Sequence, residues 1–259
     1  MAWIEGNLEV RGVRLPYYRQ GRGHPVVLAH GFSDNGRCWD RVATVLAAEY
    51  DVIAYDARYH GQSGAPADGS FGDGNDLVAL VEALELYKPA AIGHSMGAGT
   101  VAHAVRERPD LFRCAILEDP PWRDEWPSGP RMEMPNWAEL TVEKLVGLGK
   151  QQSPDWHDDE FPAWAESKLQ LRLPEGWSFR RTGITEAWRP RAEGIGVPTL
   201  LMRGGNVARG AIVSREVAQE AQRLNPRIET VCFGQAGHNI RREAFAPYVA
   251  ATTAFLARH

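Results

Sequence analysis

The sequence predicts an α/β protein built on a mostly parallel, twisted sheet of about eight strands, with helices on both faces. Short apolar runs alternate with helical segments through the first half of the chain, a pattern typical of parallel strands joined by right-handed crossovers. The same alternation returns after residue 190. We therefore expect the segment between, residues 122–190, to be a mostly helical insertion after the sixth strand.

The composition is that of a soluble globular protein, with 259 residues of which 44% are hydrophobic and 24% charged. The net charge of -4 argues against nucleic acid as a partner. No apolar run approaches membrane-spanning length and the N-terminus lacks the features of a signal peptide, so we expect a cytoplasmic protein without a membrane partner. Cys38, Cys114 and Cys232 are odd in number and widely spaced. This spacing favours buried thiols over disulfides or a metal site.

The strands of the first half are recognised by their apolar runs. Residues 25–29 (Pro-Val-Val-Leu-Ala) are continuously apolar, as in a strand buried on both faces. Two shorter runs flank Gly12 and predict a hairpin. The expected strands are residues 8–11, 14–19, 25–29, 51–55, 90–92 and 112–117. The expected helices are a segment that starts at Asp34 or Asn35 and ends near residue 49, then residues 76–86 and 96–107.

The second half begins with the insertion. It contains seven of the nine tryptophans and no clear buried strand, and it is too long for a structureless loop. Its expected helices are residues 136–150 and 159–171, and its acidic cluster is expected to be a solvated helix start rather than a metal site. That cluster consists of Asp155, Asp158, Asp159 and Glu160. The sheet pattern resumes with strands at 198–202 and 228–233 and helices at 214–224 and 242–257.

One stretch, Gly93-His94-Ser95-Met96-Gly97, lies where the fifth strand turns directly into a helix. Such a turn forces Ser95 into a strained conformation and exposes its hydroxyl. Side chains at Gly93 and Gly97 would collide with the neighbouring strand and helix. The Met96 amide at the helix N-terminus can face a developing negative charge.

Four motifs together resemble the α/β-hydrolase fold superfamily over nearly the whole chain. They are His30-Gly31-Phe32 after the third strand, Asp56 and Arg58 with Gly61 and Ser63 after the fourth, Gly93 to Gly97, and Gly237-His238 after the last strand. The sequence departs from the family in reading Arg58-Tyr59-His60-Gly61 where Arg-Gly-His-Gly is usual, in a segment that is mainly a structural turn. The resemblance implies a core domain of residues 1–121 and 191–259, covered by a helical cap (lid) of residues 122–190.

The resemblance also implies a Ser–His–acid triad. A serine hydroxyl needs a base, and His238 follows the last strand at the carboxyl edge of the sheet, where ligands bind. No Asp or Glu lies between Glu193 and Glu216, so the strand at 198–202 cannot be followed by the acid. Haloalkane dehalogenases and zearalenone-type lactonases place it after the sixth strand, where Asp119 stands. Glu118 is an open alternative, because neighbouring strand residues point to opposite faces.

The remaining site residues follow from the same resemblance. The backbone amides of Phe32 and Met96 are expected to form the oxyanion hole. The expected substrate-binding residues are Gly31, His94, Trp122, Trp177 and Trp188. Tryptophans near a cleft would suit a bulky hydrophobic substrate, but most of them are expected to pack the cap onto the core.

The expected activity is hydrolysis of a carboxylic ester or lactone of a bulky hydrophobic small molecule, through an acyl-enzyme on Ser95. A serine nucleophile argues against a haloalkane dehalogenase or an epoxide hydrolase, which use Asp at this turn. A carbon–carbon bond hydrolase, a cofactor-free perhydrolase and a ligand-sensing receptor share the same parts and remain alternatives. No cofactor or metal is implied, and the oligomeric state is left open.

Overall fold

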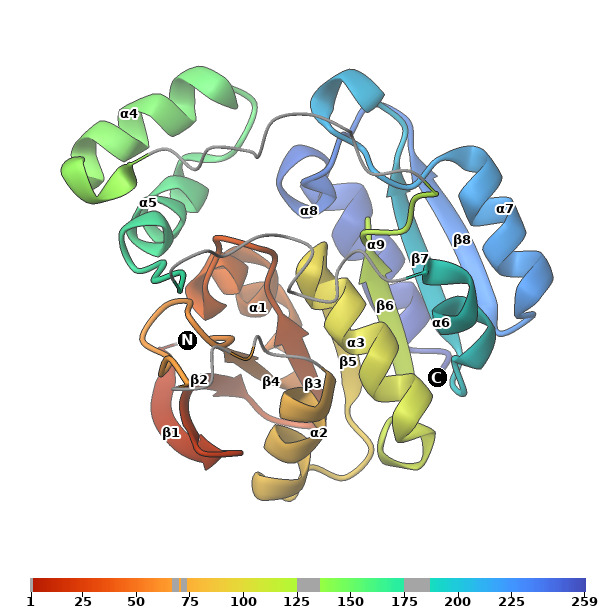
Figure 1. The fold of residues 1–259 in the computed structure, drawn as a ribbon. Helices are drawn as coiled ribbons and strands as arrows, with labels where there is room; N and C mark the ends of the chain where they lie inside the picture. Colours follow the sequence, from red (N-terminus) through yellow and green to blue (C-terminus); the bar gives the residue numbers. More distant parts are fainter. Residues whose placement is uncertain (1, 67–69, 71–73, 125–135, 175–186) are drawn as a thin grey trace.

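A single eight-stranded sheet forms the centre of the computed structural model, which describes residues 2–66, 70, 74–124, 136–174 and 187–259 (Figure 1). The strand order is β1-β2-β4-β3-β5-β6-β7-β8. The strands are β1 (Ile4–Val10), β2 (Val13–Gly21), β3 (His24–Ala29), β4 (Tyr50–Tyr55), β5 (Ala90–His94), β6 (Cys114–Glu118), β7 (Thr199–Gly204) and β8 (Ile228–Phe233). The pairs β1–β2 and β2–β4 are antiparallel and all other neighbouring strands are parallel, which confirms the predicted fold class.

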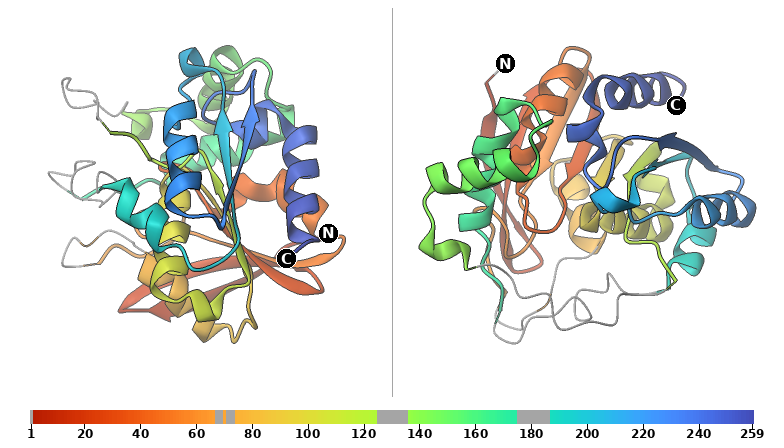
Figure 2. Two further views of the ribbon diagram at one scale, coloured as in Figure 1. Left: turned by 90° about the vertical axis from the view of Figure 1, so that its right-hand side faces the viewer. Right: turned by 90° about the horizontal axis from the view of Figure 1, so that it is seen from above.

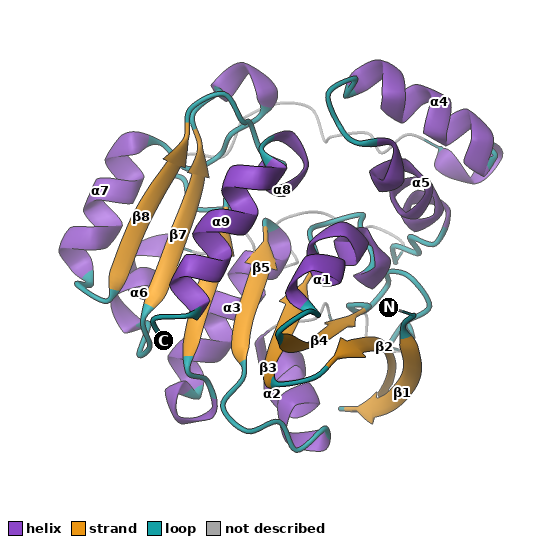
Figure 3. Cartoon of the chain, turned by 180° about the vertical axis from the view of Figure 1, so that it is seen from behind, coloured by secondary structure: helices purple, strands orange, loops and turns teal. Residues whose placement is uncertain are grey.

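Helices cover both faces of this sheet. The α-helices are α1 (Asp40–Leu46), α2 (Gly74–Ala83), α3 (Met96–Glu107), α4 (Val142–Gln152), α5 (Phe161–Leu169), α6 (Trp188–Gly194), α7 (Arg215–Leu224), α8 (Ile240–Glu243) and α9 (Phe245–Leu256). The left-hand view of Figure 2 shows α7 and α9 on opposite sides of the sheet, and Figure 3 shows α1 and α9 in front of the strands.

The period-two alternation of the strands produces two hydrophobic cores. On β3, Val27 and Ala29 pack towards α2, α3, α6 and α7, whereas Val26 and Leu28 pack towards α1 and α9. Each successive side chain of a strand points to the opposite face, so a continuously apolar strand serves both cores. Residues 25–29 thus form a strand that is buried on both faces, as predicted.

Two local predictions need correction. The closing helix is divided into α8 and α9, because Ala244 leaves the helical conformation (φ -137°, ψ 50°). Cys232 is exposed rather than buried, since β8 is an edge strand of the sheet, while Cys38 and Cys114 are buried as expected. The helix expected from Asp34 or Asn35 starts as a 3-10 turn (Gly36–Trp39), whose N-cap is Asn35.

The described part of the insertion is helical. A 3-10 turn (Trp137–Glu139) leads into α4, and a second one (Asp158–Glu160) leads into α5. Figure 1 shows α4 and α5 as a pair at one end of the molecule, with α5 between α4 and the core. No described helix combines the length and the apolar character needed to cross a membrane.

Candidate active site

Ser95 occupies the sharp turn between β5 and α3. Its backbone has φ 51° and ψ -114°, a conformation that L-residues rarely adopt, and its side chain is partly exposed. A Cβ at Gly93 would overlap the carbonyl group of Gly97, and a Cβ at Gly97 would overlap that of Ala29. The expected need for glycine at both positions is confirmed. These contacts let helix and strands approach closely enough to hold the turn.

Asp119 and His238 form a hydrogen-bonded pair at the same edge of the sheet. The distance from His238 Nδ1 to Asp119 Oδ2 is 2.7 Å. Asp119 directly follows β6, is fully buried and also has a positive φ of 42°. Its carboxylate accepts two further hydrogen bonds from the amides of Ile212 (2.9 Å) and Val213 (3.0 Å). The loop after β7 has no carboxylate of its own, but its amides hold the carboxylate that follows the neighbouring strand β6.

Glu118, the alternative acid, points elsewhere. Its carboxylate accepts from the amide of Arg241 at 2.8 Å and lies 3.4 Å from the guanidinium of the same residue. Burial raises the pKa of Glu118, and Arg241 opposes that rise. Of the two candidate acids, Asp119 is therefore the one that the structure brings into contact with the His238 ring.

The contacts of His238 determine the role of each ring nitrogen. Because Asp119 is an acceptor, Nδ1 carries the proton, and Nε2 is left to accept one. The loop is held through its backbone, since the His238 amide donates to Arg209 O (3.2 Å) and its carbonyl accepts from His94 Nε2 (3.0 Å). Burial lowers the pKa of His94 well below its ordinary value, and its ring lies 4.7 Å from that of His238. His94 thus links the serine turn to the histidine loop.

The loop after β3 carries the first expected oxyanion donor. The Gly31 carbonyl accepts from His30 Nδ1 at 2.8 Å and from the Asp34 amide at 3.1 Å. His30 Nε2 accepts from the Ala57 amide at 3.0 Å, which fixes the tautomer. Carbonyl and N–H point in opposite directions across a trans peptide. Anchoring the Gly31 carbonyl therefore also sets the direction of the Phe32 amide.

The second expected donor, the Met96 amide, lies in the first turn of α3, where amides have no partner within the helix. Gly31 is required for a separate reason, because a Cβ there would lie 2.5 Å from His94 Nδ1. The two expected donors thus lie in the turns that follow β3 and β5, which are neighbouring strands of the sheet.

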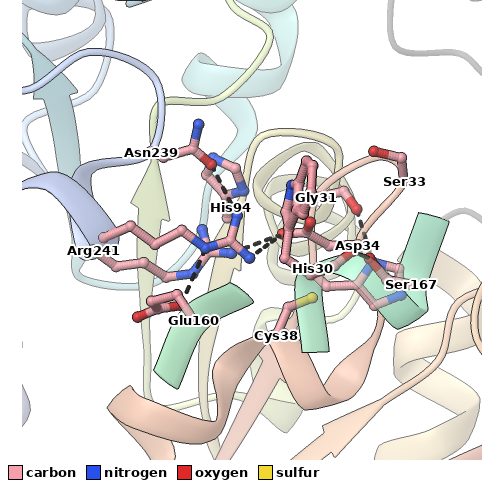
Figure 4. A network of polar contacts seen from close by, with 12 residues as sticks. His30, Gly31, Ser33, Asp34, Cys38, His94, Glu160, Ser167, Asn239 and Arg241 are labelled. Atoms are coloured by element: carbon pink, nitrogen blue, oxygen red, sulfur yellow. Dashed lines mark hydrogen bonds and ion pairs between the residues drawn. The ribbon is translucent and has the colours of Figure 1, made fainter. Parts of the chain in front are cut away.

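A buried charge cluster is centred on Asp34, in the loop after β3, and the sequence analysis did not predict it. Asp34 accepts from Lys168 (3.1 Å), Arg241 (2.8 Å) and Arg242 (3.0 Å). Figure 4 shows Arg241 and Asp34 pointing towards one another. Burial alone would raise the pKa of Asp34, but the three cations outweigh it and hold that pKa well below its ordinary value. The only sequence signal for the cluster is the Arg-Arg pair that closely follows His238.

Glu160 corrects the expectation of a solvated acidic cluster. Its side chain is buried and its carboxylate lies 3.2 Å from Arg242 Nε. The other acidic residues of that cluster are exposed, as expected. Among the described residues, no group of three or more His, Cys, Asp or Glu side chains is arranged to hold a metal ion.

Two of the expected pocket tryptophans lie in the core that contains α3 and α6. Trp122 and Trp188 are 1% and 2% exposed, and their rings stack at 5.8 Å. Besides this mutual packing, Trp188 Nε1 donates to Asp124 at 3.0 Å. A role of either ring in substrate binding stays a prediction. Trp177 lies outside the described residues.

Comparison with known proteins identifies a matching family and several similar proteins. The family model described as alpha/beta hydrolase fold matches residues 24–155. N-formylmaleamate deformylase of Pseudomonas putida is 27% identical over 97% of this chain and 96% of that protein. An epoxide hydrolase of Caballeronia sordidicola is 36% identical, over 43% of this chain and 36% of that protein. Among solved structures, E-2-(acetamidomethylene)succinate hydrolase has a TM-score of 0.78 at 19% identity, covering 98% of this chain and 99% of that one.

Proposed function

Since the chain belongs to the alpha/beta hydrolase fold family, we propose that it is a serine hydrolase that cleaves a carboxylic ester or lactone of a bulky hydrophobic small molecule. The observation that supports this most directly is the 2.7 Å hydrogen bond between His238 and Asp119, at the sheet edge where Ser95 occupies its strained turn. A positioned acid and histidine are what a serine needs to become a nucleophile at neutral pH.

In the proposed reaction, His238 Nε2 takes the proton of the Ser95 hydroxyl as Ser95 Oγ bonds to the substrate carbonyl carbon. The carbonyl π electrons move to oxygen, and this oxyanion accepts from the amides of Phe32 and Met96. Asp119 stabilises the imidazolium. His238 then returns the proton to the leaving alkoxide as the carbon–oxygen bond breaks. Water, activated by His238, hydrolyses the resulting acyl-enzyme and regenerates the serine.

Substrate selection is assigned to the insertion. We propose that residues 1–121 and 191–259 form the catalytic core and that residues 122–190 act as its cap. Gly31 and His94 would line the floor of the site. The partner is then a small molecule rather than a macromolecule or a membrane.

A second candidate bond is an amide, including a formamide. It is favoured by the similarity to N-formylmaleamate deformylase, which extends over 97% of this chain. The same residues would serve, but an amine leaves only after His238 has protonated it. Esters and amides with the same acyl group therefore distinguish the two candidates. A site adapted to amides hydrolyses both substrates, whereas a site adapted to esters hydrolyses only the ester.

The test is turnover of p-nitrophenyl esters and matched anilides by the wild type and three variants. Ser95→Ala should abolish activity, and Asp119→Asn should reduce it by about a thousandfold or more. Glu118→Gln should keep most of the activity of the folded protein, because that side chain does not reach His238. Loss of activity in Glu118→Gln together with an active Asp119→Asn would reverse the assignment of the acid.

A fluorophosphonate probe separates failure of the substrate from failure of the nucleophile. The wild type should be labelled and Ser95→Ala should not. A protein that is labelled at Ser95 but hydrolyses neither esters nor amides would refute the proposed bond types. Equal labelling of both proteins would refute Ser95 as the nucleophile.

A further inference from the structure

Lys168, on α5 of the insertion, makes an unusual contact with the core. Its side chain is 3% exposed, and its ammonium donates to Ser33 O (2.9 Å), Asp34 Oδ1 (3.1 Å) and Ser167 Oγ (3.3 Å). An ammonium has three donors, and each has a partner here. Two of these partners lie in the loop after β3, which we call the oxyanion loop (residues 30–34).

The two acceptors in this loop control its conformation. Ser33 has a φ of 63°, a strained conformation for a serine that needs surrounding contacts to persist. Asp34 closes the turn, because its amide donates to Gly31 O at 3.1 Å. The carbonyl of Gly31 and the amide of Phe32 belong to one peptide plane. Contacts that hold Ser33 and Asp34 therefore hold the direction of the Phe32 amide.

Asp34 also connects the loop to the histidine side of the site. Its second carboxylate oxygen accepts from Arg241 and Arg242 of α8, which begins two residues after His238. One carboxylate thus joins the oxyanion loop, α8 and, through Lys168, the insertion. Gln170, directly after α5, adds a second polar contact to the same region, since its Oε1 accepts from Asn35 at 2.8 Å.

We propose that Lys168 is a positioning residue. Its contacts join the insertion to the oxyanion loop and thereby fix the direction in which the Phe32 N–H points into the oxyanion hole. This rests on the proposed function, because it assigns that amide its role. A buried ion pair adds little net stability compared with well-packed apolar side chains. The distinctive effect of Lys168 is therefore expected in the geometry of the loop, which Lys168 contacts directly at Ser33 O.

The primary test compares Lys168→Met with Lys150→Met. Methionine keeps the apolar length of the side chain and removes the donors. Lys150 is the matched control, a half-exposed lysine on α4 that pairs with Asp158 at 2.6 Å. For p-nitrophenyl esters, Lys168→Met should lower kcat about 10–100-fold with KM changed less than about threefold. A misdirected Phe32 N–H weakens the hydrogen bond to the oxyanion, which forms in the transition state and not in the bound substrate. Lys150→Met should match the wild type.

A trifluoromethyl ketone, which forms a tetrahedral oxyanion adduct with a serine, provides a readout that mere stability would not move. Its affinity should fall in Lys168→Met by the same factor as kcat/KM, at temperatures where the variant is folded. Unchanged inhibitor affinity in a folded Lys168→Met protein would overturn the proposal, even if its melting temperature had fallen.

Hydrogen exchange tests the loop independently of turnover. Amides of residues 31–34 should exchange faster in Lys168→Met and at the wild-type rate in Lys150→Met. Retained activity in Ser95→Ala would refute the proposed function. The exchange rates would still show whether Lys168 holds the loop, because they do not depend on turnover. Unchanged exchange in Lys168→Met would refute the contact itself.

Lys168→Arg covers the case in which Lys168→Met does not fold. Arginine keeps the positive charge opposite Asp34, but its planar donors cannot reach Ser33, Asp34 and Ser167 with the geometry of an ammonium. It should show an intermediate loss of kcat and inhibitor affinity. Wild-type values in this variant would show that charge alone suffices and would overturn a positioning role.

Discussion

Ser33, Ser95 and Asp119 share a backbone property that bears on catalysis. All three have positive φ, at 63°, 51° and 42°. Each costs about 1–3 kcal/mol and persists only where other contacts hold it. Those contacts are Lys168 for Ser33, the glycines of the turn for Ser95, and the amides of Ile212 and Val213 for Asp119. Strained backbone at this site therefore places the proposed nucleophile, the proposed acid and the oxyanion loop at one edge of the sheet.

Gly97→Ala tests the close approach on which the serine turn depends. The new Cβ would overlap the carbonyl of Ala29 and lie 2.6 Å from that of His30. Because these are backbone atoms, relief requires movement of α3 or of the start of the oxyanion loop. We expect a loss of about 1–3 kcal/mol in the free energy of unfolding and a fall in kcat, measured by urea denaturation and ester turnover.

Gly147→Ala is the matched control on α4. Gly147 is exposed and no atom lies within 4 Å of its Cβ position. Alanine there should raise the free energy of unfolding by about 1 kcal/mol, through helix propensity alone, with unchanged turnover. Equal effects of the two substitutions would refute the argument from close approach.

Helices α5 and α8 meet on Asp34 although they are far apart in the sequence. Lys168 and Arg241 lie 134 and 207 positions from Asp34. Since the three cations approach one buried carboxylate, the cluster is favourable only as long as that carboxylate carries its charge. Elements that approach the site from different directions are thus connected through a single side chain.

Asp34→Asn should be strongly destabilising. It keeps the shape of the side chain but leaves Lys168, Arg241 and Arg242 buried with less compensating charge. We expect a loss of about 3–5 kcal/mol in the free energy of unfolding, or failure to fold. Glu82→Gln, which removes an exposed partner of Arg108, should cost about 1 kcal/mol or less. Comparable urea midpoints for the two variants would contradict the importance of the cluster.

Features marked by residues close together in the sequence could be predicted, and contacts between distant segments could not. The strands followed from their apolar runs, and the turn around Ser95 followed from glycines within two residues of it. Asp119 was favoured over Glu118 by resemblance alone, since one position along a strand end decides which face a side chain takes. The charge cluster could not be predicted, because its partners come from α5, α8 and the loop after β3. The break at Ala244, by contrast, has a local signal that the predicted continuous helix overlooked, because Pro247 has no N–H for Glu243 O and fits only the first turn of a new helix.

The sheet as a whole brings these loops together. The loops after β3, β5, β6 and β8 all leave from the carboxyl ends of parallel strands, and these ends share one edge of the sheet. The same packing buries His30, His60 and His94 around the site. Burial lowers the pKa of each of the three, to about 3 for His60. Each of these rings is therefore harder to protonate in the folded protein than in the unfolded chain.

We expect the free energy of unfolding to fall as the pH drops below 6.5. In that range the unfolded chain binds more protons at these histidines than the folded protein does, so acid favours unfolding. Each histidine can contribute up to about 1.4 kcal/mol per pH unit, and for His60 the window extends down to about pH 3. Above pH 6.5 the contribution vanishes. Asp34, whose pKa is held low by its three cations, stays charged through most of this window and loses its contribution only at more acidic pH.

Urea denaturation at pH 7.5, 6.5, 5.5 and 4.5 measures this dependence directly. His60→Gln should show a shallower pH dependence than the wild type, because it removes one of the groups that bind a proton only on unfolding. Since the effect arises from burial rather than from surface charge, 0.5 M NaCl should leave most of the slope in place. A free energy of unfolding that stays constant from pH 7.5 to 4.5 would show that the buried histidines become protonated without unfolding, and that the core around the site is more open to water than its packing implies.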